Sequence, residues 1–89
     1  MAEYSAGDLT GMFAHIWKGT RDGIPDNQVR INRQVSPGEW EIQYMSWVDG
    51  RLNKTTVVPE STLRGGLCVM YHTVQEMTGA WDRHYQHRL

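Results

Sequence analysis

The sequence predicts a small α+β domain: a three-stranded antiparallel meander between two helices, in the order α-β-β-β-α, with both helices packed on one face of the sheet. Two observations carry this prediction. Apolar and polar residues alternate with a period of two over residues 28–35, 40–48 and 51–58, as in half-buried strands. Apolar residues spaced by three and four positions precede and follow this region, as in amphipathic helices. The 89 residues, 1–89, have the length of one small domain.

The first helix is predicted from its start signal and its apolar stripe. Ser5 and Asp8 have the spacing of a capping box, in which two side chains satisfy the first backbone N–H groups of a helix. Five apolar residues then share one helix face: Leu9, Met12, Phe13, Ile16 and Trp17. Gly19 ends the segment, and we expect the stripe to lie against the core.

The meander is the most regular part of the sequence. Three residues of its second strand alternate with polar ones and are predicted to face the core: Trp40, Ile42 and Tyr44. Pro37 and Gly38 before this strand suit a type II turn. Asp49 and Gly50 after it suit a two-residue type I′ turn, in which both residues need positive φ.

Pro59 opens the last segment, in which apolar residues recur at spacings of three and four from Leu63 to Tyr85. This spacing predicts an amphipathic helix that runs almost to the C-terminus. The competing interpretation is a fourth strand over residues 67–73, because Val, Tyr and Thr are frequent there. The helix accounts for more positions over a longer window, although Gly65 and Gly66 would make its first turn irregular.

Composition and motifs argue against several classes of function. The net charge of −1 argues against a general polyanion binder, and a single cysteine excludes an intramolecular disulfide and a Cys-rich zinc finger. The sequence has no nucleotide-binding glycine loop, zinc-protease motif or serine-hydrolase elbow, so we expect no enzyme activity, catalytic residue or cofactor. It has no apolar run of about 20 residues and no secretion signal, which predicts a cytoplasmic protein without a membrane span.

Cys68 and His72 are the residues closest to a metal-binding pattern. In the predicted helix they lie one turn apart on the face opposite Leu67, so we expect an exposed thiol beside a solvated imidazole. His84 and His87 form a second pair, but about 18 Å would separate His72 from His84 on a straight helix. We therefore predict no metal site.

The expected order α-β-β-β-α is similar to that of the double-stranded-RNA-binding domain. The resemblance covers topology alone. That family carries a basic cluster at the start of its last helix, whereas residues 59–64 of this chain hold one positive charge. Nucleic-acid binding is the alternative function. It would use Arg30 and Lys54 on the sheet, with Trp47 available for base stacking.

The leading functional prediction is a non-catalytic module, an adaptor or inhibitor, that binds a partner protein. On the outer side of the sheet, Met45, Trp47 and Val57 are predicted to form an apolar centre framed by polar residues, the composition of an interface. Arg30 and Lys54 complete the predicted binding residues as charges at the rim. Compact inhibitors of the kind that phages and mobile elements encode would fit this profile. A homodimer is also open, since shared apolar surface would add to a small core.

Overall fold

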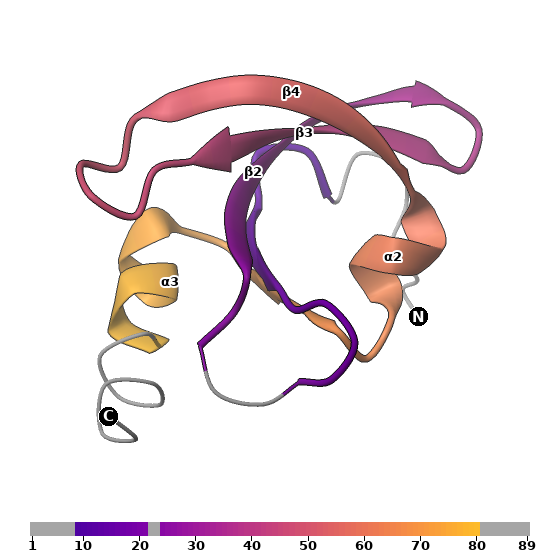
Figure 1. Ribbon diagram of the computed structural model, residues 1–89. Coiled ribbons are helices and arrows are strands. Elements are labelled where there is room, and N and C mark those ends of the chain that lie inside the picture. The colour runs from indigo at the N-terminus through magenta and orange to yellow at the C-terminus, as the bar shows by residue number, and fades with distance from the viewer. Residues whose placement is uncertain (1–8, 22–23, 81–89) are drawn as a thin grey trace.

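The computed structural model describes residues 9–21 and 24–80. Its elements are β1 (Phe13–Ile16), β2 (Asn27–Ser36), β3 (Glu39–Met45), β4 (Leu52–Pro59), α2 (Glu60–Arg64), β5 (Cys68–Tyr71) and α3 (Val74–Ala80). Within the described ranges, five strands form one antiparallel sheet in the order β4-β3-β2-β1-β5 (Figure 1). The α+β class is therefore confirmed, and the sheet is larger than the predicted meander.

The predicted meander is present as β2, β3 and β4. The two-residue connection between β2 and β3 holds Gly38 at φ 77°, the positive φ that a type II turn needs at its second central residue. The connection between β3 and β4 is not the predicted type I′ turn. Gly50 has φ 74°, but no described residue other than glycine has positive φ, so Asp49 does not adopt that conformation. A longer loop forms instead, in which the Ser46 carbonyl accepts the Gly50 N–H (3.0 Å) and the Ser46 N–H donates to the Arg51 carbonyl (2.9 Å).

The predicted first helix is wrong from Phe13 onward, because Phe13–Ile16 is strand β1. The backbone turns away from helix just before it: Gly11 has φ 85° and donates its N–H to the Ile31 carbonyl (2.8 Å), while the Ile31 N–H donates to the Met12 carbonyl (2.7 Å). β1 then pairs with β2 on one side and with β5 on the other. Ser5 and Asp8, the proposed capping box, lie outside the described residues.

The single long helix predicted after Pro59 is also wrong. The chain forms α2, then strand β5, then α3, so the competing strand at 67–73 is the correct interpretation of that stretch. Gly65 ends α2 where a Cβ atom would lie 2.9 Å from the Ser61 carbonyl oxygen, closer than a side chain tolerates. Two glycines thus end the helical run, and β5 adds to the free side of β1.

The core lies on the concave side of the sheet. Buried side chains from β1, β2 and β3 meet Leu63 of α2 there: Ala14, Val29, Ile31, Trp40 and Ile42. The indole Nε1 of Trp40 donates a hydrogen bond to Oε1 of Glu60 at the start of α2 (2.9 Å). α2 contacts both β4 and β5, the two edge strands, and so bridges the two ends of the curved sheet (Figure 1). Register shifts in β2, between Ile31 and Arg33 and between Gln34 and Ser36, accompany this curvature.

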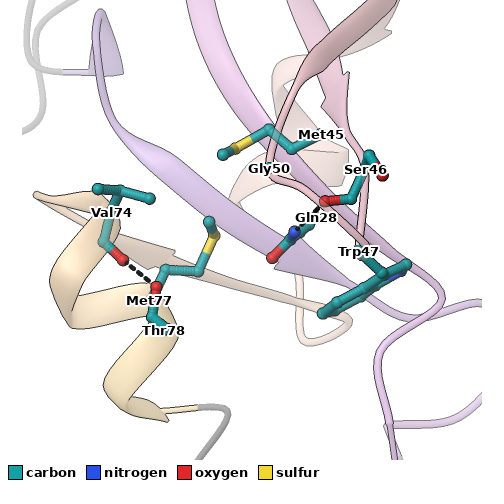
Figure 2. Close-up of a pocket in the computed structure, with 8 residues that line it drawn as sticks. All are labelled: Gln28, Met45, Ser46, Trp47, Gly50, Val74, Met77 and Thr78. Carbon is teal, nitrogen blue, oxygen red and sulfur yellow. Dashed lines mark hydrogen bonds between the residues drawn. The ribbon is translucent and has the colours of Figure 1, made fainter.

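α3 does not share the face that α2 covers, which corrects the prediction that both helices pack on one side. It contacts β1 and β5, and its residues Val74 and Met77 meet the side of the sheet that carries Gln28 and Met45 (Figure 2). The described elements, with four strands before α2 and a fifth after it, also differ from the order α-β-β-β-α of the double-stranded-RNA-binding domain. No helix within residues 9–21 and 24–80 has the length and apolar character to span a membrane.

Candidate functional site

The candidate site begins with a row of side chains on the sheet face opposite the core. Strand register places His15 of β1 opposite Gln28 of β2, Gln28 opposite Met45 of β3, and Met45 opposite Leu52 of β4. Side chains of directly paired residues lie on the same face of a sheet. The row therefore runs from a fully buried imidazole at β1 to Leu52, which is 38% exposed at the sheet edge.

Trp47, in the loop after β3, covers the buried end of this row. Its ring stacks on that of His15, with centroids 5.8 Å apart and an angle of 21° between the planes. The rings of Tyr71 and Trp17 meet His15 edge-on, at 5.1 Å and 6.4 Å between centroids. Trp47 is nevertheless 43% exposed. Its position is thus set by ring packing beneath it while a large aromatic area remains at the surface.

His15 acts in this cluster as a neutral aromatic group. Burial lowers its pKa to about 4, and a side-chain hydrogen bond with Gln28 opposes that shift. Its Nδ1 also lies 3.2 Å from the hydroxyl of Tyr71. At neutral pH the ring is therefore uncharged and packs against Trp47 as an apolar surface would.

α3 forms the second wall of the site. Its first turn is capped by reciprocal hydrogen bonds: the Glu76 N–H donates to Oγ1 of Thr73 (3.1 Å), and Oε1 of Glu76 accepts the N–H of His72 (2.9 Å). Val74 and Met77 of this helix line one pocket together with Gln28 and Met45 of the sheet (Figure 2).

A cleft of about 220 Å³ lies between α3, the sheet and the loop after β3 (Figure 2). We call it the Trp47 cleft; its lining residues are Gln28, Met45, Ser46, Trp47, Gly50, Val74, Met77 and Thr78. Gln28 is held in place by its own hydrogen bond, from Nε2 to the Ser46 carbonyl (3.1 Å). None of these lining residues is charged, so the cleft offers thioether, aromatic and aliphatic contacts with a few amide and hydroxyl groups.

The predicted binding residues are divided between two places. Met45 and Trp47 meet in the cleft, whereas Arg30, Lys54 and Val57 do not line it. The Arg30 guanidinium donates to Oδ1 of Asn32 (3.0 Å) and to Oε1 of Gln43 (3.3 Å), on the open part of the sheet.

Lys54 and Val57 both belong to the edge strand β4. Val57 is opposite Glu41 and is half exposed. Lys54 is exposed and, by its place in the strand, alternates in side-chain direction with Thr55.

The exposed thiol predicted for Cys68 is wrong. Cys68 starts β5, pairs with Ile16, and belongs to the buried core cluster. Burial raises the pKa of its thiol to about 11, and the nearby charge of Arg21 opposes this shift only in part. His72 is exposed in the turn after β5, so the two side chains do not form the pair that a helix would give.

No group of three or more potential ligands in residues 9–21 and 24–80 is placed to hold a metal ion; His84 and His87 lie outside those ranges.

Sequence reasoning missed His15, Val74 and Met77 as parts of the site. Residues 13–16 do not alternate apolar with polar side chains, so no strand pattern at His15 stands out from the helical spacing around it. Val74 and Met77 were correctly expected in a helix, but that helix was placed on the wrong face of the sheet. Comparisons of this chain with protein-family models, curated proteins and solved structures gave no match.

Proposed function

We propose that this protein is a non-catalytic binding module that recognises a partner protein through the Trp47 cleft, as an adaptor or inhibitor. The observation that carries the proposal is an aromatic ring that is both exposed and held in place. Trp47 stacks on the buried His15 ring, yet 43% of it is exposed beside an uncharged cleft.

The energy available from this ring is that of an interface hot spot. A Trp side chain contributes roughly 200 Å² on burial, so the exposed part offers roughly 100 Å², or about 2.5 kcal/mol at about 25 cal/mol per Å². A ring already held by packing loses little conformational freedom on binding, so more of this energy appears as affinity. Met45 and Met77 beside it are flexible and polarizable, which suits contact with an apolar side chain.

The chemistry of the cleft indicates what the partner presents. A volume of about 220 Å³ without charged lining fits one large apolar side chain. Gln28, Ser46 and Thr78 supply amide and hydroxyl groups at its walls. Each already hydrogen-bonds within the chain, so the backbone of a partner segment is offered only the remaining hydrogen-bonding capacity of the Gln28 amide and of the two hydroxyls. We therefore expect the partner to insert an aromatic or long aliphatic residue from a loop or strand.

The test compares capture of partners from the native cytoplasm by immobilised wild-type protein and by Trp47→Ala. Val35→Ala is the matched control, because Val35 is 40% exposed and lies near the opposite end of the β2–β3 hairpin. A protein that is captured by wild type and the control, and lost with Trp47→Ala, is then purified for calorimetry. We expect its affinity for Trp47→Ala to fall at least about thirtyfold, the threshold of a hot spot.

A second variant guards against loss of binding through altered folding. Val74→Glu leaves the Trp47–His15 stack in place and puts a carboxylate at the cleft wall, in the first turn of α3, where a negative charge is favourable to the helix. It should retain the wild-type circular dichroism spectrum and lose the partner. If a folded Trp47→Ala and a folded Val74→Glu both bind the partner as tightly as wild type does, the proposal is wrong.

Nucleic-acid binding is the alternative outcome of the same experiments. It has less support, because the Arg30 guanidinium is engaged by Asn32 and Gln43, and Arg33 forms an ion pair with Glu41 (3.3 Å). A fluorescein-labelled single-stranded oligonucleotide is the probe. Binding that falls steeply with added salt and is reduced by Arg30→Ala, but not by Val74→Glu, would favour this function over the cleft.

A further inference from the structure

The sheet has two edges of different character. β5 has four residues and is contacted by α2, whereas β4 has eight residues, most of them exposed, and meets α2 only where the helix follows it (Figure 1). Within the described ranges, β4 pairs with β3 alone and has no strand on its other side. Natural proteins usually shorten, cover or charge such an edge, because its backbone groups can pair with another strand. On β4, Lys54 is the one charged side chain.

The hydrogen-bond pattern shows which backbone groups of β4 point to this edge. Glu39 lies opposite Pro59, and the Glu60 N–H donates to the Gly38 carbonyl (2.8 Å). Gly38 precedes Glu39 and Glu60 follows Pro59, so this bond joins the neighbours of the pair and not the paired residues themselves. Glu39 and Pro59 are therefore a non-hydrogen-bonded pair. Pairs alternate along an antiparallel ladder, so Thr56 and Val58 bond to β3 through their backbones. Thr55, Val57 and Pro59 direct theirs outward.

We propose that two copies of this chain pair through β4, antiparallel, about a two-fold axis at Thr56. In this register Thr55 of each copy lies opposite Val57 of the other, and each such pair exchanges both of its backbone hydrogen bonds. The two five-stranded sheets become one continuous sheet. The contact is isologous, since the same strand is used on both sides.

Side chains in this register are compatible. Thr56 of one copy lies opposite Thr56 of the other at a non-hydrogen-bonded position, where side chains are close and Thr–Thr pairs are favourable. Lys54 lies opposite Val58, so no like charges face each other across the axis. A register centred on Val57 instead would place Thr55 opposite Pro59, which has no N–H to donate, in the hydrogen-bonded pair next to the central one. In the register centred on Thr56, Pro59 lies opposite Asn53, outside the two Thr55–Val57 pairs. The net charge of −1 gives little repulsion between whole copies.

The outward backbone groups of β4, the side chains that would face each other and the net charge are therefore all compatible with a second copy at this edge. This inference does not depend on the Trp47 cleft. An edge-strand contact is small, so we expect a reversible dimer that forms in the micromolar to submillimolar range.

Sedimentation equilibrium over about 5 to 500 µM measures the association, a range chosen for a small interface. Two double variants test the register with matched changes at exposed positions. Thr55→Glu with Val57→Lys places opposite charges across the axis, and its lysine also lies opposite Glu41 of its own chain. Thr55→Lys with Val57→Lys places like charges there. We expect the first to dimerise at least as tightly as wild type, and the second at least tenfold more weakly.

Trp47→Ala should leave the dimer unchanged, which separates this inference from the proposed function. Circular dichroism checks that each double variant folds. Both changed residues are exposed, so neither substitution removes a core contact. A wild-type chain that remains monomeric to the highest concentration would overturn the proposal. Equal association of the two folded double variants would overturn the register.

Discussion

Acidification from about pH 7.5 to about pH 5 should weaken the folded state through one side chain, His15. The ring of His15 is fully buried between Trp47 and Tyr71, and burial lowers its pKa from 6.5 to about 4. In the unfolded chain the same imidazole takes up a proton near pH 6.5. Between these two pKa values the unfolded state binds a proton that the folded state excludes. The stability that neutral His15 contributes is therefore fully present above about pH 6.5 and is lost as the pH falls toward 4.

The size of this loss follows from the two pKa values. One pKa unit corresponds to about 1.4 kcal/mol, and the full shift to about 3.5 kcal/mol as an upper limit. At pH 5 the folded ring is still mostly neutral, and the loss relative to pH 7.5 is about 2 kcal/mol. Hydrogen bonds from Asn32 and from Trp40 are the largest causes that lower the pKa values of Glu41 and Glu60 respectively, and Arg charges add to them. The stability that these two carboxylates contribute is therefore lost only as the pH falls below about 4.5. Among the described groups whose pKa is shifted, His15 is thus the one whose protonation affects stability between about pH 7.5 and pH 5.

Urea denaturation at a series of pH values measures this loss as a falling free energy of unfolding. His15→Phe is the control, because Phe keeps a ring to stack against Trp47 and has no group that titrates. We expect the variant to have a nearly flat profile between about pH 7.5 and pH 5. A wild-type slope that persists in His15→Phe, or an NMR titration of His15 near pH 6.5, would refute the reasoning.

Two further predictions concern the core. Trp40→Ala should reduce the free energy of unfolding by about 3–5 kcal/mol, because it leaves a cavity at a fully buried position and removes the hydrogen bond to Glu60; a melting temperature within a few degrees of wild type would contradict this. The Cys68 thiol should react with an aromatic disulfide reagent at pH 8 at least a hundredfold more slowly in the native protein than in urea, because it is buried and its pKa is raised to about 11. Similar rates in the two samples would contradict the buried position.

The sequence alone was sufficient for the meander, because its strands are local and one-sided. Trp40 and Ile42 face the core while Glu41 and Gln43 face outward, and this alternation is legible without a structure. The turn residues predicted the connection at Gly38 correctly. At Asp49 they predicted a two-residue type I′ turn where the chain forms a longer loop.

β1 and β5 were misread because they carry no such contrast. β1 lies between two strands and beneath Trp47, so Ala14 and His15 are both buried and period-two alternation disappears. Its pairing with β5 joins residues as far apart as Phe13 and Tyr71. A local pattern does not report a contact of that length, and the spacing of Phe13, Ile16 and their neighbours imitates a helix.

The candidate site divides along the same line. The outward direction of Met45 was determined by the alternation within β3. The stack of Trp47 on His15, the placement of Met77 beside them and the burial of Cys68 were decided only when β1 entered the sheet and α3 crossed to the outer face. Local sequence determines which residues alternate along a strand, whereas the partner strands and the covering helix determine which of its faces remain exposed.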